Sequence, residues 1–137
     1  MKAVVLAALA LYVACSLHAS PGRGVDSNND GAPDQWYEVS DGRIQKVSLD
    51  RNYDSLIDYA VEYDLQHRKL YEEMDFNHDG KMDDFYFFEE GKLIREEIDS
   101  NFDGAVDIWV HLDGMYILRY EMDSDFDGKI DLTRNYE

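Results

Sequence analysis

A nine-residue segment rich in aspartate occurs five times along the chain, and this repetition restricts the fold more than any other feature. The copies read "DSNNDGAPD", "DRNYDSLID", "DFNHDGKMD", "DSNFDGAVD" and "DSDFDGKID". They begin at residues 26, 50, 75, 99 and 123, so successive copies start 24 or 25 residues apart. A fixed period of this size is typical of repeat proteins, in which each repeat is one supersecondary unit. We therefore expect one repeat domain spanning residues 26–137.

Four places of the segment carry an oxygen-bearing side chain in every copy. Counting the first Asp as place 1, they are places 1, 3, 5 and 9. These candidate ligands are Asp26, Asn28, Asp30, Asp34, Asp50, Asn52, Asp54, Asp58, Asp75, Asn77, Asp79, Asp83, Asp99, Asn101, Asp103, Asp107, Asp123, Asp125, Asp127 and Asp131. Place 6 is glycine except in the second copy, which has Ser55. Glycine permits the sharp bend that brings such side chains together.

The residues between the segments alternate with a period of two and include many aromatics, a pattern typical of β-strands. Asp41 with Gly42, Glu90 with Gly91 and Asp113 with Gly114 predict tight hairpin turns. Each full repeat thus reads as strand, turn, strand and acidic loop. Chained together, the repeats predict an all-β antiparallel meander of about nine strands, as an open twisted or a curled sheet. All five loops then lie at one edge, with neighbouring loops roughly 10 Å apart.

The two faces of the predicted sheet differ in composition. Places 12 and 14 are mostly apolar and are expected to line the main buried face. The opposite face carries Trp36, Phe85, Phe87 and Trp109, which either pack beneath another layer or form an exposed aromatic stripe for contact with a glycan or protein. The histidines at positions 67, 78 and 111 are expected at the surface or in loops.

The N-terminal residues predict export. Residues 1–15 combine Lys2 with an apolar run that is too short to span a bilayer, as in a secretory signal. Leu11 and Ala14 before Cys15 resemble the lipobox of bacterial lipoproteins, which implies lipidation of Cys15; ordinary signal cleavage is the alternative. Residues 16–25 lack a pattern and are expected to form a flexible tether. Because Cys15 is the only cysteine, no internal disulfide can staple the domain.

The strong negative charge limits the kinds of partner. The net charge is −17, with 30 acidic against 13 basic residues. Such a chain repels nucleic acid and anionic lipid headgroups, so contact with a membrane is expected only through a lipid anchor. Calcium takes about six to eight oxygen ligands, which suits the acidic loops, whereas zinc and copper favour His and Cys. We therefore expect up to five calcium ions, bound least tightly by the loop with Ser55.

The loop pattern D-x-N-x-D-G-x-x-D resembles the calcium loops of integrin-type β-propellers and thrombospondin type 3 repeats, and its first half resembles the EF-hand loop. An EF-hand has Glu at place 12, where this chain has Tyr37, Val61, Tyr86, Val110 and Arg134. Thrombospondin type 3 repeats carry disulfides and integrin-type propellers have longer repeats, so the resemblance covers the loops and not a whole fold. The strand-turn-strand unit resembles repeats of bacterial surface lipoproteins. The resemblance implies calcium binding in an exported protein.

These observations favour a non-enzymatic, calcium-binding protein of the bacterial cell envelope, with a periplasmic or secreted protein as the alternative. Calcium is expected to act as a structural staple for a surface module that binds a protein or glycan, or that serves as a scaffold. A calcium-responsive sensor or buffer is the second reading. A carboxylate-dependent hydrolase is the third, although the sequence has no G-x-S-x-G or H-E-x-x-H motif.

Overall fold

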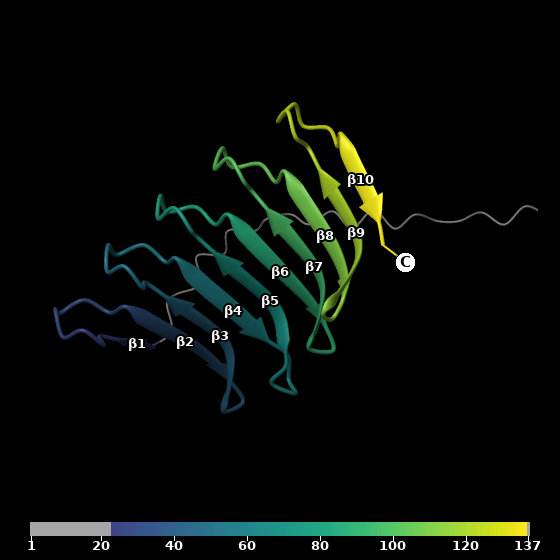
Figure 1. The fold of residues 1–137 in the computed structure, drawn as a ribbon. Helices are drawn as coiled ribbons and strands as arrows, with labels where there is room; N and C mark the ends of the chain where they lie inside the picture. Colours follow the sequence, from purple (N-terminus) through teal and green to yellow (C-terminus); the bar gives the residue numbers. More distant parts are fainter. Residues whose placement is uncertain (1–22, 137) are drawn as a thin grey trace, which may run out of the picture.

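The computed structural model describes residues 23–136, which form one all-β sheet of ten strands (Figure 1). No helix long and apolar enough to cross a membrane occurs within these residues. The strands are β1 (Arg23–Val25), β2 (Gln35–Ser40), β3 (Arg43–Leu49), β4 (Tyr59–Tyr63), β5 (Lys69–Met74), β6 (Asp84–Glu89), β7 (Lys92–Ile98), β8 (Ile108–Asp113), β9 (Tyr116–Met122) and β10 (Leu132–Asn135).

The strands lie in the sheet in the order in which they occur in the chain. Every strand pairs antiparallel with its neighbours, so the predicted meander is confirmed. The sheet is open and twisted, with β1 and β10 at its two ends (Figure 1). Its tenth strand is β1, which lies at the end of the segment expected as a tether; residues 16–22 of that segment are outside the described part of the chain.

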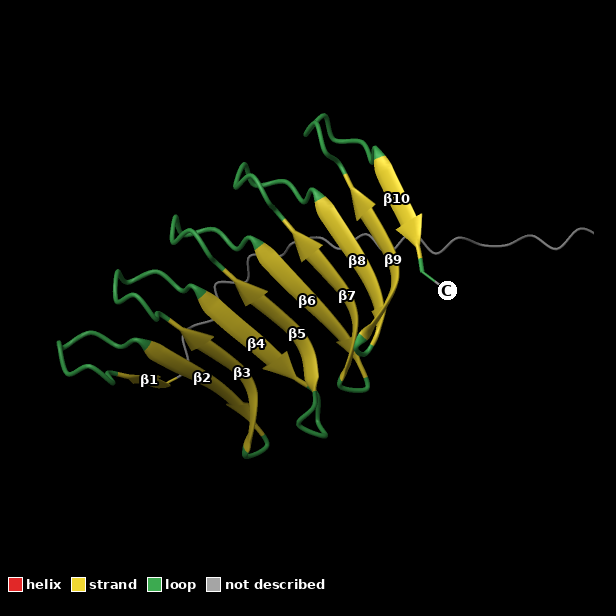
Figure 2. Cartoon of the chain, in the orientation of Figure 1, coloured by secondary structure: helices red, strands yellow, loops and turns green. Residues whose placement is uncertain are grey.

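The connections alternate between the two edges of the sheet. Loops 1 to 5 cover residues 26–34, 50–58, 75–83, 99–107 and 123–131, and each leads from an odd-numbered to an even-numbered strand. In a meander these connections must share one edge, and Figure 2 shows them side by side there, with the short turns at the other edge. The expected row of acidic loops is therefore present.

Two of the three predicted hairpin turns have the expected residues. Asp41 and Gly42 adopt positive φ angles of 52° and 74°, and Glu90 and Gly91 adopt 51° and 79°, as a two-residue type I′ turn requires. The third prediction is wrong by one residue, since Asp113 still pairs with Tyr116 and belongs to β8. The turn therefore begins at Gly114, whose φ is 66°.

The expectation of one main buried face is wrong. The buried apolar residues of the described chain are Ala60, Val61 and Val110, and Ala60 and Val61 point to opposite faces because they are consecutive in β4. Val39, at place 14, is 61% exposed. The cause is that the sheet is a single layer: within residues 23–136 no second layer covers either face (Figure 1).

The aromatic face packs sideways instead of beneath a cover. Trp36, Phe85 and Trp109 are half-buried and lie in one cross-strand row. In this row Glu73 and Glu97 flank Phe85, and Glu97 and Glu121 flank Trp109. In the next row the guanidinium of Arg95 lies 4.1 Å from the centre of the Phe87 ring. The Arg95 side chain therefore covers part of the Phe87 ring while leaving the face open to solvent.

On the other face, the buried carboxyl of Asp84 beside Tyr86 lowers the stability of the protein in a pH-dependent way. Asp84 is 4% exposed and its Oδ1 has no hydrogen-bond partner, while its Oδ2 accepts a 2.6 Å bond from the Tyr86 hydroxyl. Burial raises the pKa of Asp84, and the Tyr86 bond offsets part of that rise. Because the pKa of Asp84 is higher in the folded than in the unfolded state, ionisation of Asp84 lowers the free energy of unfolding. This loss of stability is complete at pH values above the folded-state pKa and absent at pH values below the unfolded-state pKa.

We predict that Asp84→Asn unfolds at a higher temperature than the wild type at pH 7, by a few degrees, because the variant carries no charge to bury. The advantage should shrink as the pH falls to about 4, the ordinary pKa of an aspartate. Thermal melts of both proteins in one calcium-containing buffer series measure this. Asp41→Asn, at an exposed turn residue, is the control. An advantage that stays constant between the two pH values would contradict the prediction.

Candidate metal-binding loops

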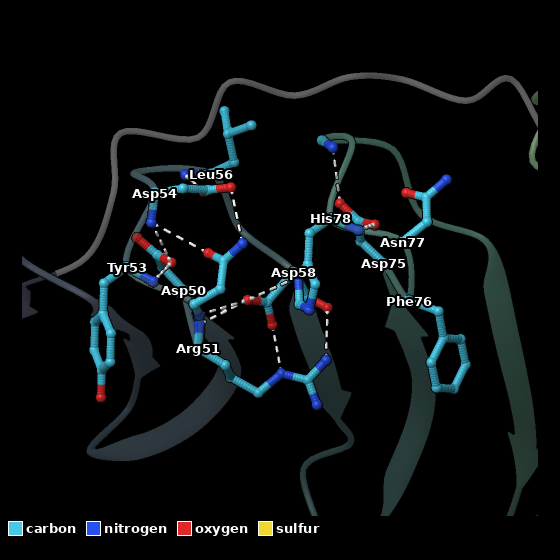
Figure 3. A network of polar contacts seen from close by, with 12 residues as sticks. Asp50, Arg51, Tyr53, Asp54, Leu56, Asp58, Asp75, Phe76, Asn77 and His78 are labelled. Atoms are coloured by element: carbon cyan, nitrogen blue, oxygen red, sulfur yellow. Dashed lines mark hydrogen bonds and ion pairs between the residues drawn. The ribbon is translucent and has the colours of Figure 1, made fainter.

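The first aspartate of each loop binds main-chain amides of its own loop. In loop 2, Oδ1 of Asp50 accepts hydrogen bonds from the amides of Tyr53 (2.6 Å) and Asp54 (3.2 Å), as Figure 3 shows. Its Oδ2 accepts one from the amide of Ser55 (2.8 Å). The amide at place 6 donates to place 1 in all five loops. These bonds curl the chain around one carboxylate, so place 1 sets the shape of the loop.

The last aspartate ties the end of each loop to its beginning. In loop 4, Oδ2 of Asp107 accepts hydrogen bonds from the amides of Ser100 (2.8 Å) and Asn101 (3.3 Å). The same two amides donate to place 9 in each of the other loops. In loops 1, 4 and 5 a serine hydroxyl at place 2 adds a further bond. The carboxylate at place 9 therefore holds the beginning of each loop against its end.

The side chains at places 3 and 5 meet as well. The Nδ2 of Asn28 donates to Asp30 over 2.8 Å, and loops 2 and 4 repeat this bond at 2.9 Å. In loop 5, carboxylate oxygens of Asp123, Asp125 and Asp131 lie within 4.8 Å of one another. Opposite ligands of one calcium ion are separated by about twice the ligand distance of 2.3–2.6 Å, so these three oxygens fit a single ion.

A ladder of main-chain hydrogen bonds joins the loops to one another. The amide of Asp50 donates to the carbonyl of Asp34 over 2.8 Å, and that of Asp75 donates to the carbonyl of Asp58 over 2.9 Å. Loops 3 to 4 and 4 to 5 are joined in the same way. Place 9 of one loop therefore lies beside place 1 of the next, and the sheet edge carries a continuous row of aspartates.

Most of this row is buried. Eight loop aspartates are between 1% and 4% exposed, namely Asp34, Asp50, Asp58, Asp75, Asp83, Asp99, Asp107 and Asp123. Within residues 23–136, ion pairs reach only Asp58 among these eight. Burying ionised carboxylates without a cation is costly. The amides compensate part of that cost, and the row still lacks balancing positive charge.

Like charges also meet among the exposed candidate ligands. In loop 5 the neighbouring carboxylate of Asp131 raises the pKa of Asp125. In loop 1 the pKa of Asp30 is lowered instead, because Asp30 accepts hydrogen bonds from the Ala32 amide and the Asn28 side chain. Loop 5, the only one with Asp at place 3, therefore has the strongest repulsion to relieve by binding a cation.

Each loop contains two residues in the left-handed backbone region. Place 6 has φ between 75° and 97° in all five loops, which glycine adopts without strain and Ser55 (75°) does not. Place 4 is also left-handed in every loop, at 60° to 64°, although its residues are Asn29, Tyr53, His78, Phe102 and Phe126. The pattern of Asp and Gly revealed the bend at place 6 and gave no signal of the bend at place 4.

The structure brings the side chains at places 3 and 5 together in loops 1, 2 and 4, and the carboxylates at places 1, 3 and 9 together in loop 5. Among residues 23–136 it shows no such group of three carboxylates in the other four loops. It also adds two residues that sequence reasoning missed. Arg51, at place 2 of loop 2, pairs with Asp58 through its Nε, and His78 of loop 3 reaches Asp58 from the neighbouring loop, with its Nδ1 3.8 Å from Oδ2. His78, expected to be a surface loop residue, thus bridges two loops (Figure 3). The sequence did contain a signal for the first contact, because loop 2 has Arg51 at place 2, where three other loops have serine.

Comparisons with known proteins support the fold class alone. No protein-family model matches the chain, and no curated protein matches it. The crystal structure of accessory secretory protein 1, 2 and 3 in Streptococcus pneumoniae is similar with a TM-score of 0.53 at 14% identity, over 80% of this chain and 22% of that chain. The GtfA/B complex bound to UDP and GlcNAc gives 0.49 at 12% identity, over 86% and 27%. This chain therefore spans about a quarter of the length of each of these two chains.

Because Ser55 holds a left-handed conformation, we predict that Ser55→Gly stabilises the protein by about 1 kcal/mol. The matched reversal is Gly104→Ser in loop 4, where a side chain would meet no atom within 4 Å, so only backbone strain is added. Gly104→Ser should destabilise the protein by a similar amount. Urea unfolding of both variants at fixed calcium concentration measures the two changes. A destabilised Ser55→Gly variant would contradict the backbone argument.

Proposed function

We propose that the protein is an exported, calcium-binding repeat protein whose ions hold the loop edge of the sheet together. The observation that carries this proposal is the row of eight buried loop aspartates, of which only Asp58 has an ion pair within residues 23–136. A divalent cation that prefers oxygen ligands would supply the missing positive charge. Since the chain has no internal disulfide, such ions would take over the role of covalent staples.

In a loop that binds an ion, the ligands would be the side chains at places 1, 3, 5 and 9, joined by the main-chain carbonyl at place 7. This set consists of oxygen atoms, and neither Cys nor His supplies any of the four places. It therefore fits calcium better than zinc or copper. The strongest carboxylate clusters belong to these loops, so we assign the protein a binding role and not a catalytic one.

A structural role for calcium is favoured over a sensor role by the position of the ligands. The residues at places 1 and 9 take part in the main-chain ladder that continues the sheet into the loops. Ion binding there would act on the same hydrogen bonds that hold adjacent strands together. A sensor instead needs an element with two alternative arrangements, which a continuous ladder disfavours.

The open faces of the sheet are the surfaces that such a module would present. The face with Trp36, Phe85 and Trp109 combines half-buried rings with the carboxylates of the intervening strands. Aromatic rings beside polar groups are common in surfaces that bind proteins or sugars. We therefore assign the presentation of a protein- or glycan-binding surface to this face.

The main test of the calcium proposal is a pair of thermal melts, in EDTA and in calcium. We predict a rise of more than about 10 °C in calcium, since each site adds about 2.7 kcal/mol when free calcium is 100 times its Kd. Magnesium at the same concentration should raise the melting temperature less, because it keeps more of its water. Coincident melts in EDTA and calcium would refute the proposal.

Isothermal titration with calcium then separates the two roles. Structural modules outside the cell bind calcium with Kd values of about 10⁻⁴–10⁻³ M, whereas sensors bind at about 10⁻⁷–10⁻⁵ M. Kd values in the weaker range would support a structural role for calcium. Values in the tighter range would favour the sensor.

The envelope location rests on residues outside the described part of the chain, and we predict that it depends on Cys15. The expected lipid anchor requires this thiol, so Cys15→Ser should move the protein from the membrane fraction to the soluble fraction of expressing bacteria. Cell fractionation followed by immunoblotting measures the distribution. Asp41→Asn, which leaves the N-terminal segment unchanged, should remain with the membranes. Equal membrane binding of the Cys15→Ser and wild-type proteins would disprove lipid anchoring.

A further inference from the structure

Loop 2 differs from the other four loops in the residue that contacts its last aspartate. In loops 1, 4 and 5 the residue at place 2 is serine, and its hydroxyl donates to the aspartate at place 9 over 2.7 to 2.9 Å. A hydroxyl is neutral, so the carboxylate keeps its full negative charge. Loop 2 has Arg51 at this place, which brings a positive charge to the same carboxylate.

Arg51 surrounds Asp58 with donors (Figure 3). Its Nε donates to Oδ1 of Asp58, its Nη2 donates to the main-chain oxygen of Asp58 over 3.1 Å, and its amide donates to Oδ2 over 2.7 Å. The guanidinium also lies 5.4 Å from the centre of the Tyr59 ring. Asp58 itself is 2% exposed. Both of its carboxylate oxygens are therefore engaged within the loop.

The corresponding aspartates of loops 3, 4 and 5 keep one oxygen uncommitted. In these loops, as the structure describes them, every hydrogen bond to Asp83, Asp107 and Asp131 falls on Oδ2. Oδ1 of each is thus available to a metal ion. In loop 1 the neutral Ser27 hydroxyl donates to Oδ1 of Asp34, whereas in loop 2 the positively charged Arg51 occupies Oδ1 of Asp58. A divalent ion in loop 2 would have to displace the guanidinium or bind beside its positive charge.

Loop 2 is also fastened to loop 3 by side chains. The Nδ1 of His78 lies 3.8 Å from Oδ2 of Asp58. The side chain of Leu56 lies so close to Gly80 that a Cβ added there would be 2.9 Å from Leu56 Cδ1. These contacts do not involve the ligand places of loop 3. Loop 2 can therefore hold its neighbour in place without an ion of its own.

We propose that loop 2 binds no metal ion and is closed instead by Arg51, so that the protein takes four calcium ions although it has five acidic loops. The calcium count rests on the proposed function, whereas the closure of loop 2 by Arg51 does not. Loop 2 is then the metal-independent anchor of the row, and it keeps the edge formed around β3 to β6 when the other loops lose their ions.

Ion counting by native mass spectrometry and equilibrium dialysis with calcium tests the first part. The wild type should bind four ions. Asp54→Asn and Asp103→Asn are a matched pair, because both carboxylates are exposed at place 5 and each accepts a bond from the amide two residues later. Asp54→Asn should leave four ions, and Asp103→Asn should leave three. Five ions in the wild type, with one lost in Asp54→Asn, would overturn the inference while supporting calcium binding.

A gain of binding tests whether Arg51 and Ser55 are the cause. The double variant Arg51→Ser with Ser55→Gly gives loop 2 the same residues at places 1, 2, 3, 5, 6 and 9 as loop 4. It should bind one calcium ion more than the wild type. An unchanged count would show that these two residues do not exclude the ion, and would overturn the inference.

Melting in EDTA tests the closure by Arg51 without any metal. Arg51→Met keeps most of the apolar stem and removes the charge, and it should melt roughly 5 °C below the wild type. The control is Lys129→Met, which removes a positive charge from a loop residue whose side chain is 78% exposed, and it should melt at the same temperature as the wild type.

If the wild type binds no calcium, the proposed function fails, and these melts alone decide the role of Arg51. Equal melting of Arg51→Met and the wild type would then refute it.

Discussion

The burial of aspartate carboxylates against main-chain amides along one edge is the interaction on which this structure depends. The carboxylate at place 1 shapes each loop, and the carboxylate at place 9 closes it, as in Asp99 and Asp107 of loop 4. Main-chain bonds between successive loops then place these groups side by side. The fold therefore gathers like charges in a buried row, on a chain whose net charge is already −17. Positive charge at this edge is the requirement that follows.

Apart from the buried aspartates of the loop edge, the sheet has few sources of stability. Among residues 23–136, only Ala60, Val61 and Val110 are buried apolar residues, and the side chains of Asp58, Asp75 and Asp107 are the largest that are fully buried. A single layer cannot enclose an apolar core, because each side chain has solvent on its own face. Stability must then come from strand pairing, from lateral packing such as that of Arg95 on Phe87, and from the loop edge. This distribution explains why ions at the loops would affect the whole domain.

Local sequence signals predicted the features that recur in every repeat. The acidic segments, the alternating strands and the turns at Asp41 with Gly42 and Glu90 with Gly91 all depend on residues close together in the chain, and all are present. The turn at Gly114 was misplaced because the pairing of Asp113 with Tyr116 extends β8 by one residue. The distribution of burial between the faces was predicted wrongly because it depends on whether another layer covers them, and alternation along a strand carries no information about that.

The sequence by itself determined the all-β repeat, the edge at which the loops lie and the four places in each loop that carry an oxygen-bearing side chain, because spacing along the chain controls these. The tertiary structure decided what each carboxylate meets. It placed Arg51 and His78 around Asp58, left Oδ1 of Asp83 and Asp107 uncommitted, and paired Arg23–Val25 with β2 as a tenth strand. These contacts join residues of different loops or strands, or they depend on the direction in which one side chain points. The spatial arrangement of the strands and loops determines such contacts, and the period of the repeat does not.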